Sequence, residues 1–292
     1  EPMRWLEVTD PLGATERVEF WMSSIQVPAT DQAAQVPTGF TGNSSLNQRN
    51  TYYWDKRAHL LYPGDQTKAE ITHWLQSDIF AIAPIAGWVK KPFENRVWYQ
   101  QSSPPIPGGI GPTGRPAQVG RVLDDGTSQI SRYEWGTRGN VTRYTDPLGR
   151  ETLYEFASDD IDLLRIKQKN PGAAGGYDLL ATVTYNAQHE PLTSTDASGQ
   201  VTTFTYDQFG RRTQMDTPTA PPVDERLLNC TAPGASCPTN AVLRALTMQP
   251  GAPTVTRYLD VLGRASHLRL RAVAEHIDVG RPRAVPGGGG RR

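Results

Sequence analysis

The sequence predicts an all-β protein built from repeated antiparallel β-hairpins. Two observations favour this class. A turn motif, Asp followed three residues later by Gly, returns along the chain, and short stretches of alternating residues that end on an aromatic side chain follow it. The composition agrees, because 27 Gly and 24 Pro supply many turns, while 11 Tyr and 7 Trp are residues typical of strands.

The turn motif recurs in four copies. Thr9 to Phe20 reads T-D-P-L-G-A-T-E-R-V-E-F, and Thr145 to Phe156 reads T-D-P-L-G-R-E-T-L-Y-E-F. Thr195 to Tyr206 keeps Asp, Gly and a terminal aromatic residue in register, and Leu259 to Leu270 keeps Asp and Gly without the aromatic residue. Asp accepts hydrogen bonds from backbone N–H groups just ahead of it, and Gly takes a positive φ at little steric cost. Four copies in register indicate a repeated unit of one turn and one strand.

A second half-unit alternates with the first, and it reads Y-E-W-G-T-R-G-N-V-T, Y-N-A-Q-H-E-P-L-T and Y-D-Q-F-G-R-R-T from Tyr133, Tyr185 and Tyr206. Tyr185 and Tyr206 are 21 residues apart, which gives the period of the best-preserved stretch. Two units make a hairpin, and a hairpin needs neighbours to be stable. The predicted structural repeat positions are Asp10, Gly13, Phe20, Tyr133, Gly139, Asp146, Gly149, Phe156, Tyr185, Asp196, Gly199, Tyr206, Asp207, Gly210, Asp260 and Gly263.

These phrases resemble the Rhs/YD repeats of bacterial polymorphic-toxin shells, a family related to the shells of Tc toxins and of teneurins. The resemblance covers about Gly120 to Gly263. It implies part of a spiral YD-repeat shell that encapsulates a C-terminal toxin, so the expected partners are the rest of the parent shell and that toxin. It also implies a secreted or cell-surface parent protein. The family's closing motif, near which an aspartyl autoprotease often releases the toxin, has no counterpart here, so we expect a partial or truncated copy that is not an enzyme.

We expect five segments. They are a divergent N-terminal repeat or spacer region at 1–119, regular YD/Rhs repeats at 120–217, an insertion at 218–252, a further repeat at 253–264 and an irregular Arg- and Gly-rich tail at 265–292.

Within these segments, residues 27–50 and 102–116 lack periodicity, and we expect an irregular insertion and an exposed loop there. The aromatic stretch 52–99 is expected to form strands of a sheet covered on one side. Residues 161–169 and 179–186 are expected to pair as a hairpin, and 240–248 to form one short helix.

The sequence predicts no catalytic residue, no cofactor and no metal site. The five His residues are scattered, and His189 stands near the place where other half-units have a turn Gly. Residues 124–126 (D-D-G) are typical of a hairpin turn, and the acids within 159–162 lack the further oxygen ligands of a calcium loop. The net charge is zero and no stretch of 18 apolar residues occurs, so we expect neither nucleic-acid binding nor a membrane span.

Two other functions stay open. Exposed aromatic residues, Trp88 and Trp98 above all, could stack on sugars in a carbohydrate-binding or adhesion module. Alternatively the chain is a non-functional gene fragment, because it begins with Glu1, shows no signal peptide and has no aromatic residue after Tyr258. The two cysteines, in one turn-rich loop at 230–237, close a disulfide in an oxidising compartment or remain free thiols in the cytosol.

Overall fold

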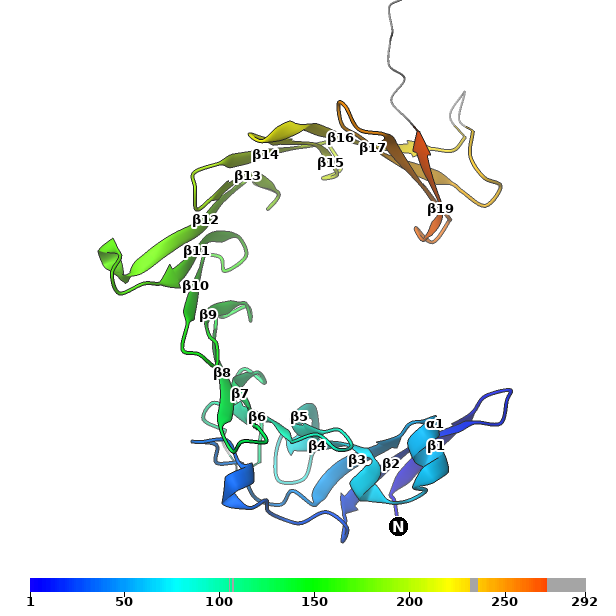
Figure 1. The fold of residues 1–292 in the computed structure, drawn as a ribbon, viewed down its shortest axis with the longest axis vertical. Coiled ribbons are helices and arrows are strands. Elements are labelled where there is room, and N and C mark those ends of the chain that lie inside the picture. The colour runs from blue at the N-terminus through cyan, green and yellow to red at the C-terminus, as the bar shows by residue number, and fades with distance from the viewer. Residues whose placement is uncertain (105, 107, 232–235, 272–292) are drawn as a thin grey trace, which may run out of the picture. The chain divides into compact units, whose positions relative to one another are not determined.

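The computed structural model describes every residue except 105, 107, 232–235 and 272–292. Within the described residues the chain forms 19 strands, one short α-helix and three 3-10 turns, and all recorded pairings between these strands are antiparallel (Figure 1). The expected all-β class with repeated antiparallel hairpins is therefore confirmed. The chain divides into two units, Glu1–Thr182 and Val183–Arg292.

In the first unit each strand pairs with the next one along the chain, which is the pattern of consecutive hairpins. Its strands are β1 (Arg4–Thr9), β2 (Thr15–Ser23), β3 (Gln48–Trp54), β4 (Glu70–Gln76), β5 (Ile82–Lys90), β6 (Val97–Gln101), β7 (Pro116–Val122), β8 (Ser128–Trp135), β9 (Val141–Thr145), β10 (Glu151–Phe156), β11 (Leu163–Lys169) and β12 (Tyr177–Tyr185), which runs over the unit boundary. The helical elements are η1 (Ala33–Gln35), α1 (Lys56–Leu61), η2 (Gln66–Lys68) and η3 (Ala174–Gly176).

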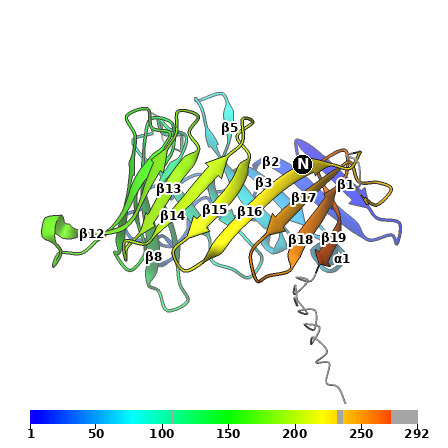
Figure 2. The same cartoon turned by 90° about the horizontal axis from the view of Figure 1, so that it is seen from above.

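The second unit continues the same pattern, and Figure 2 shows its strands side by side in chain order. They are β13 (Pro191–Asp196), β14 (Val201–Tyr206), β15 (Arg212–Thr217), β16 (Ala220–Asn229), β17 (Leu243–Met248), β18 (Thr254–Leu259) and β19 (Ala265–Arg271). Cys230 and Cys237 both lie in the segment that joins β16 to β17, and they form a disulfide with their Cα atoms 5.8 Å apart.

The main core lies in the first unit, under the segment 24–47 that joins β2 to β3. We call this segment the cover. Its apolar residues Val27, Phe40 and Leu46 pack with buried residues of the sheet, among them Trp88 and Trp98. Residues 27–50 are expected to be an irregular insertion, and most of them belong to this cover. The cover closes one face of the sheet, and a sheet covered on one side is the expectation for 52–99.

Phe40 of the cover lies directly on Gly120 of β7. A Cβ atom at Gly120 would lie 2.9 Å from the Phe40 ring, so the ring packs where a side chain would otherwise stand. Nearby, the backbone N–H of Thr38 donates to the Ser128 hydroxyl at 3.1 Å. Glycine at this strand position therefore permits the close approach of the cover.

An ion pair also ties the cover to the sheet. Arg96 Nε lies 3.0 Å from Asp31 Oδ2, and both side chains are at least nine-tenths buried. The Arg96 guanidinium stacks 3.7 Å from the Trp88 ring centroid and 5.3 Å from that of Trp98. Burial raises the pKa of Asp31, while Arg96 opposes the rise. A buried pair of this kind is costly to break, because removal of either partner leaves a charge without compensation.

Three local expectations differ from the structure. Leu243–Met248 is strand β17, because it pairs with β16 and β18 on both sides and those ladders override helix propensity. Residues 265–271, expected to be irregular, form β19 against β18, and the rest of the predicted tail lies outside the described residues. The loop 102–116 is not wholly exposed, because Gly109 and Gly111 are buried and Gly109 bridges to Gln76.

Within the described residues no helix has the length and apolar character needed to cross a bilayer.

Truncation of Phe40 should test whether the cover is an integral part of the core. The side chain is 9% exposed, so Phe40→Ala should lower the free energy of unfolding by about 3–5 kcal/mol. Urea unfolding followed by tryptophan fluorescence measures this. The matched control is Phe80→Ala, since Phe80 is 92% exposed and its loss should change stability by less than about 0.5 kcal/mol. Equal effects of the two substitutions would show that the cover contributes no packing.

Candidate functional site

One turn geometry repeats along the chain, and the turn between β9 and β10 shows it fully. The Asp146 N–H donates to the Arg150 carbonyl at 3.0 Å, and the Gly149 N–H donates back to the Asp146 carbonyl at 2.9 Å. Asp146 Oδ1 accepts from the N–H groups of Leu148 and Arg150, both at 2.9 Å. Gly149 has φ +80°, a conformation that other residues rarely adopt. A single carboxylate oxygen thus satisfies two turn donors, which is why Asp begins the motif.

Five more turns in the described residues have the same side-chain bonds, with N···Oδ1 distances between 2.9 and 3.1 Å. We call all six the Asx turns. The other five begin at Asp10, Asn186, Asp196, Asp207 and Asp260.

The Asn186 turn has the same hydrogen bonds as the other Asx turns, although its sequence does not fit the Asp-x-x-Gly pattern. Asn replaces Asp, and His189 takes the left-handed position with φ +64°. Its N–H donates to the Asn186 carbonyl at 3.1 Å, as Gly does in the other turns. The structure therefore places His189 at the Gly position of a turn. The signal in the sequence was the spacing behind Tyr185, together with Asn, which tolerates the same hydrogen bonds.

In four of the Asx turns that begin with Asp, the second carboxylate oxygen, Oδ2, accepts a hydrogen bond from a cation. Arg150, Arg211 and Arg264 follow the turn glycine and donate through Nε to Oδ2 of their own Asp at 2.6, 2.7 and 2.8 Å. At Asp10 the equivalent residue is Ala14, and Lys56 of α1 supplies the ammonium instead at 2.8 Å.

The Asn186 turn reverses this polarity. Asn186 Nδ2 donates to Glu190 Oε2 at 2.6 Å, so an acid occupies the place that Arg holds in the Asp turns. In this turn and in the three Asp turns that carry Arg at that place, the side chain four residues after the turn's first residue therefore matches the donor or acceptor character of that first residue.

The carboxylates of these turns are held in the charged form. The side-chain hydrogen bond from Arg211 lowers the pKa of Asp207, and that from Lys56 lowers the pKa of Asp10. At Asp260 the backbone N–H of Arg264 is the largest cause of a lowered pKa. At Asp196, which has no cation at the fourth position, the Ser198 hydroxyl lowers the pKa.

Neighbouring turns also contact each other within each unit. In the first unit Asp160, in the turn between β10 and β11, has φ +59°, and its carboxylate accepts from the Arg138 N–H of the turn between β8 and β9 at 2.9 Å. In the second unit a Cβ at Gly210 would lie 2.5 Å from Glu190 Oε1, so glycine leaves room for the Glu190 side chain. Turns on one edge of each sheet are thus packed against each other as well as closed internally.

The aromatic repeat positions lie at or near strand ends. Phe20 is buried in β2, and Tyr133 of β8 stands 5.2 Å from the Tyr144 ring. Phe156, Tyr185 and Tyr206 end β10, β12 and β14. The predicted repeat positions therefore do not gather in one pocket, and they recur along both units at turns and strand ends.

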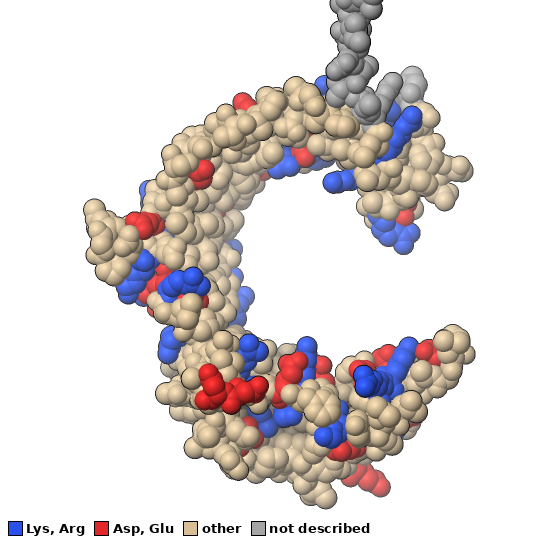
Figure 3. Space-filling model, viewed as in Figure 1, with Lys and Arg blue, Asp and Glu red and all other residues tan. Residues whose placement is uncertain are grey.

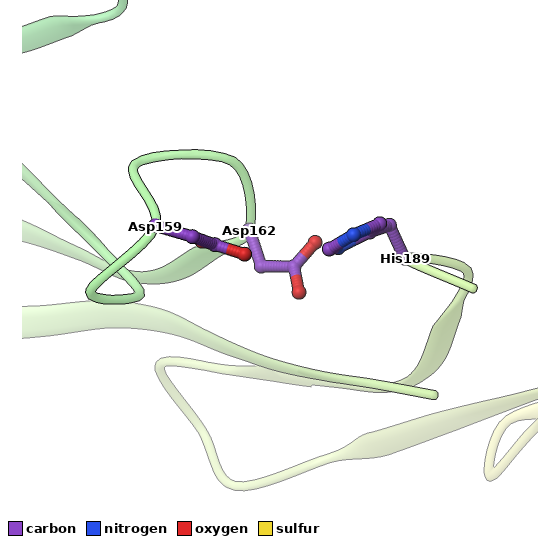
Figure 4. A group of neighbouring side chains, drawn as sticks. All are labelled: Asp159, Asp162 and His189. Carbon is purple, nitrogen blue, oxygen red and sulfur yellow. The ribbon is translucent and has the colours of Figure 1, made fainter. Parts of the chain in front are cut away.

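Three side chains considered as metal ligands belong to two loops (Figure 4). Asp159 and Asp162 lie between β10 and β11 in the first unit, and His189 lies in the Asx turn that follows β12 in the second. Asp159 Oδ1 accepts from the Ile161 N–H at 3.1 Å. Asp159 and His189 therefore each have a turn role in their own unit, and no metal chemistry is assigned to them.

The two tryptophans considered for sugar stacking are not exposed. Trp88 is 1% exposed and Trp98 is 2% exposed. One face of Trp88 stacks on His73 with ring centroids 5.2 Å apart, and Arg96 lies 3.7 Å from the same ring. These rings act in the core rather than as a sugar platform. On the face drawn in Figure 3, charged side chains of both signs lie beside one another in places, and broad areas carry neither sign.

A comparison with protein families identifies the repeat. Residues 185–220 match the family model described as RHS Repeat. This stretch is similar to an RHS repeat. The matched stretch contains the Asx turns that begin at Asn186, Asp196 and Asp207, which share the hydrogen bonds of the other three.

Solved structures similar to the chain include crystal structures of TcdB2-TccC3, at 11% identity and a TM-score of 0.49 over 89% of this chain. A form of TcdB2-TccC3 without its hypervariable C-terminal region has 12% identity and a TM-score of 0.48. The chain spans only 13% and 12% of the length of those two chains. No curated protein matches the chain.

The polarity match within Asx turns of the RHS repeat predicts a rescue. Asp207→Asn should lower the urea midpoint, because the Asn amide turns a donor towards Arg211 in place of Oδ2. Adding Arg211→Glu should restore much of the loss, since the pair then copies Asn186 and Glu190. Arg211→Glu alone should also destabilise, because it sets two carboxylates against each other. Additive effects in this double-mutant cycle would show that the two positions do not interact.

The lowered carboxyl pKa values predict an acid-dependent loss of stability. A group with a depressed folded pKa stabilises fully above its unfolded value, about 3.9 for Asp, and loses this as the pH falls through its folded value. The stability difference between wild type and Asp196→Asn should therefore shrink as the pH falls from 5 through the lowered pKa of Asp196. Urea midpoints measure it, with Asp216→Asn in the exposed part of β15 as control. A pH-independent difference would contradict the assignment.

Proposed function

We propose that the chain is a wall segment of a β-shell, and that its function is to enclose another polypeptide. The carrying observation is the Asx turn, which reverses the chain between consecutive strands at six connections in the described residues. Hairpins joined in this way add to a sheet one after another without closing a compact core. The RHS repeat over 185–220 supports this proposal.

The second unit has the burial of a wall rather than of a globule. Among its described residues only Tyr258 is buried. A single layer of strands leaves side chains on both faces partly accessible, and a globular domain of this size would bury many more. The unit therefore gains its stability from ladders and cross-strand pairs more than from a core.

Both faces of this layer mix apolar and polar side chains. The strand registers place Phe204, Met215, Val223, Leu227 and Val255 on one face, together with Glu225 and Arg257. The opposite face carries Gln214, Asp224, Arg226 and Arg244, together with Leu228, Leu246 and Met248. The half-buried apolar side chains need a further layer of polypeptide to cover them.

The proposed partners follow from this arrangement. They are the rest of an RHS-repeat shell, which would continue the sheet, and a polypeptide such as a toxin that lies against the wall. A shell of this kind would act in a secreted or surface protein, and the segment would act structurally rather than as an enzyme. For a carbohydrate-binding role, the two tryptophans expected to stack on sugars, Trp88 and Trp98, are buried.

The first test uses the chain by itself. We expect β-rich circular dichroism, strong binding of an apolar dye and association that grows with concentration, because half-buried apolar side chains and the strand edges are uncovered. A monomer that melts cooperatively and binds no dye would contradict the wall proposal.

The second test uses the longer protein that contains this chain. The enclosed polypeptide should resist protease in the wild type and become cleavable when Asp146→Ala and Asp207→Ala open two Asx turns. The matched control is Asp216→Ala, an exposed strand residue. Equal protease resistance in all three proteins would show that these turns do not support a barrier.

A further inference from the structure

The disulfide of the second unit closes a short ring in the segment that joins β16 to β17, since Cys230 and Cys237 are 7 positions apart in the sequence. We call residues 230–237 the clip. Two backbone hydrogen bonds fix its base on the sheet. The Cys230 N–H donates to the Val242 carbonyl at 2.9 Å, and the Val242 N–H donates to the Leu259 carbonyl, also at 2.9 Å. The clip therefore begins beside the end of β18, where Leu259 is the last residue.

The clip contacts Tyr258, the residue before Leu259 in β18. The Tyr258 hydroxyl donates to the Ser236 carbonyl at 3.3 Å. Ser236 directly precedes Cys237, so the disulfide restrains the position of this carbonyl. The hydrogen bond thus links the disulfide ring to a strand 22 positions further along the chain.

Tyr258 is also the one buried residue among those described in the second unit, and it is 5% exposed. It lies in a single layer of strands, opposite Arg244 of β17 and His267 of β19. A large side chain on such a layer has one side open to solvent unless another segment covers it. The hydrogen bond to Ser236 identifies the clip as a segment that covers Tyr258.

Thiol–disulfide exchange can open and close the ring. Two molecules of a small thiol supply two electrons and two protons, the S–S bond between Cys230 and Cys237 becomes two thiols, and the reagent becomes a disulfide. Glutathione disulfide drives the reverse reaction and is itself reduced to two glutathione molecules. Both cysteines are half-buried rather than enclosed, so a reagent of this size can approach them.

We propose that the clip is a redox-responsive device that controls the exposure of Tyr258. With the disulfide closed, the Ser236 carbonyl stays over the Tyr258 hydroxyl and the middle of the β17–β18–β19 ladder is covered. With the disulfide reduced, Ser236 is released, Tyr258 becomes accessible and these three strands lose stability. This inference does not rest on the wall proposal, and its tests need no enclosed polypeptide.

The reactivity of the Tyr258 hydroxyl tests the proposal. The full chain is compared in its oxidised form and after reduction with dithiothreitol and alkylation of both thiols with iodoacetamide. N-acetylimidazole acetylates accessible tyrosine hydroxyls, and mass spectrometry of the peptides gives the rate at each one. We expect Tyr258 to be acetylated about tenfold faster, or more, after reduction, because the clip no longer covers it.

Tyr206 is the control in the same experiment. It is half-buried, and its hydroxyl donates to the Pro191 carbonyl at 2.8 Å rather than to the clip, so its rate should not change on reduction. An unchanged rate at Tyr258 would overturn the proposal. An equal rise at Tyr206 would overturn it as well, because reduction would then unfold the unit as a whole.

A tyrosine variant separates the clip from a disulfide that only shortens a loop. Tyr258→Phe keeps the ring and removes the donor to Ser236, so in the oxidised chain it should lower the ratio of folded to unfolded protein about fivefold. In the reduced and alkylated chain the same substitution should change this ratio less than about twofold, because the acceptor has already been released. Urea unfolding of both forms measures the two effects.

The matched control is Tyr206→Phe, which removes the donor to Pro191 and should have the same effect in both redox forms. The double variant Cys230→Ser with Cys237→Ser controls for the reagents, since its Tyr258 should be acetylated rapidly with or without dithiothreitol. Equal effects of Tyr258→Phe in the oxidised and reduced chains, or a slowly acetylated Tyr258 in the double variant, would contradict the inference.

Discussion

The hydrogen bonds between an Asx side chain and the backbone of its own turn are the constraint on which the rest of the structure depends. At Asp146 one oxygen accepts from two N–H groups that would otherwise have no partner in the chain. The turn then reverses direction within a few residues, and the glycine at φ +80° brings the next strand back in register. Short strands that pair with their neighbours along the chain follow from a reversal that is completed locally.

The two units use this constraint differently. In the first, the cover adds Val27, Phe40 and Leu46 to one face of the sheet and creates a core with Trp88 and Trp98. In the second, the described residues remain a single layer with only Tyr258 buried. The same hairpins therefore make a covered sheet where an insertion is long and apolar enough, and an open wall where it is not.

How far the sequence predicts the structure depends on whether the interaction is local. The turns at Asp146, Asp196 and Asp207 are predictable, because the residues that make each hydrogen bond lie within four positions. The Asn186 turn is harder to recognise, since Asn and His replace Asp and Gly while the backbone keeps the same bonds. The cover is not predictable from periodicity, because Phe40 contacts Gly120, which is 80 residues away in the sequence.

Amide hydrogen exchange within one turn tests the central role of the side-chain acceptor most directly. In the Asp207 turn, the Phe209 N–H donates to Asp207 Oδ1 at 2.9 Å, whereas no hydrogen bond is recorded for the neighbouring Gln208 N–H. Both residues are exposed, so burial does not separate them. The account predicts slower exchange at Phe209 than at Gln208 in the folded chain, with the difference lost in Asp207→Ala. Equally fast exchange at the two amides in the wild type would contradict it.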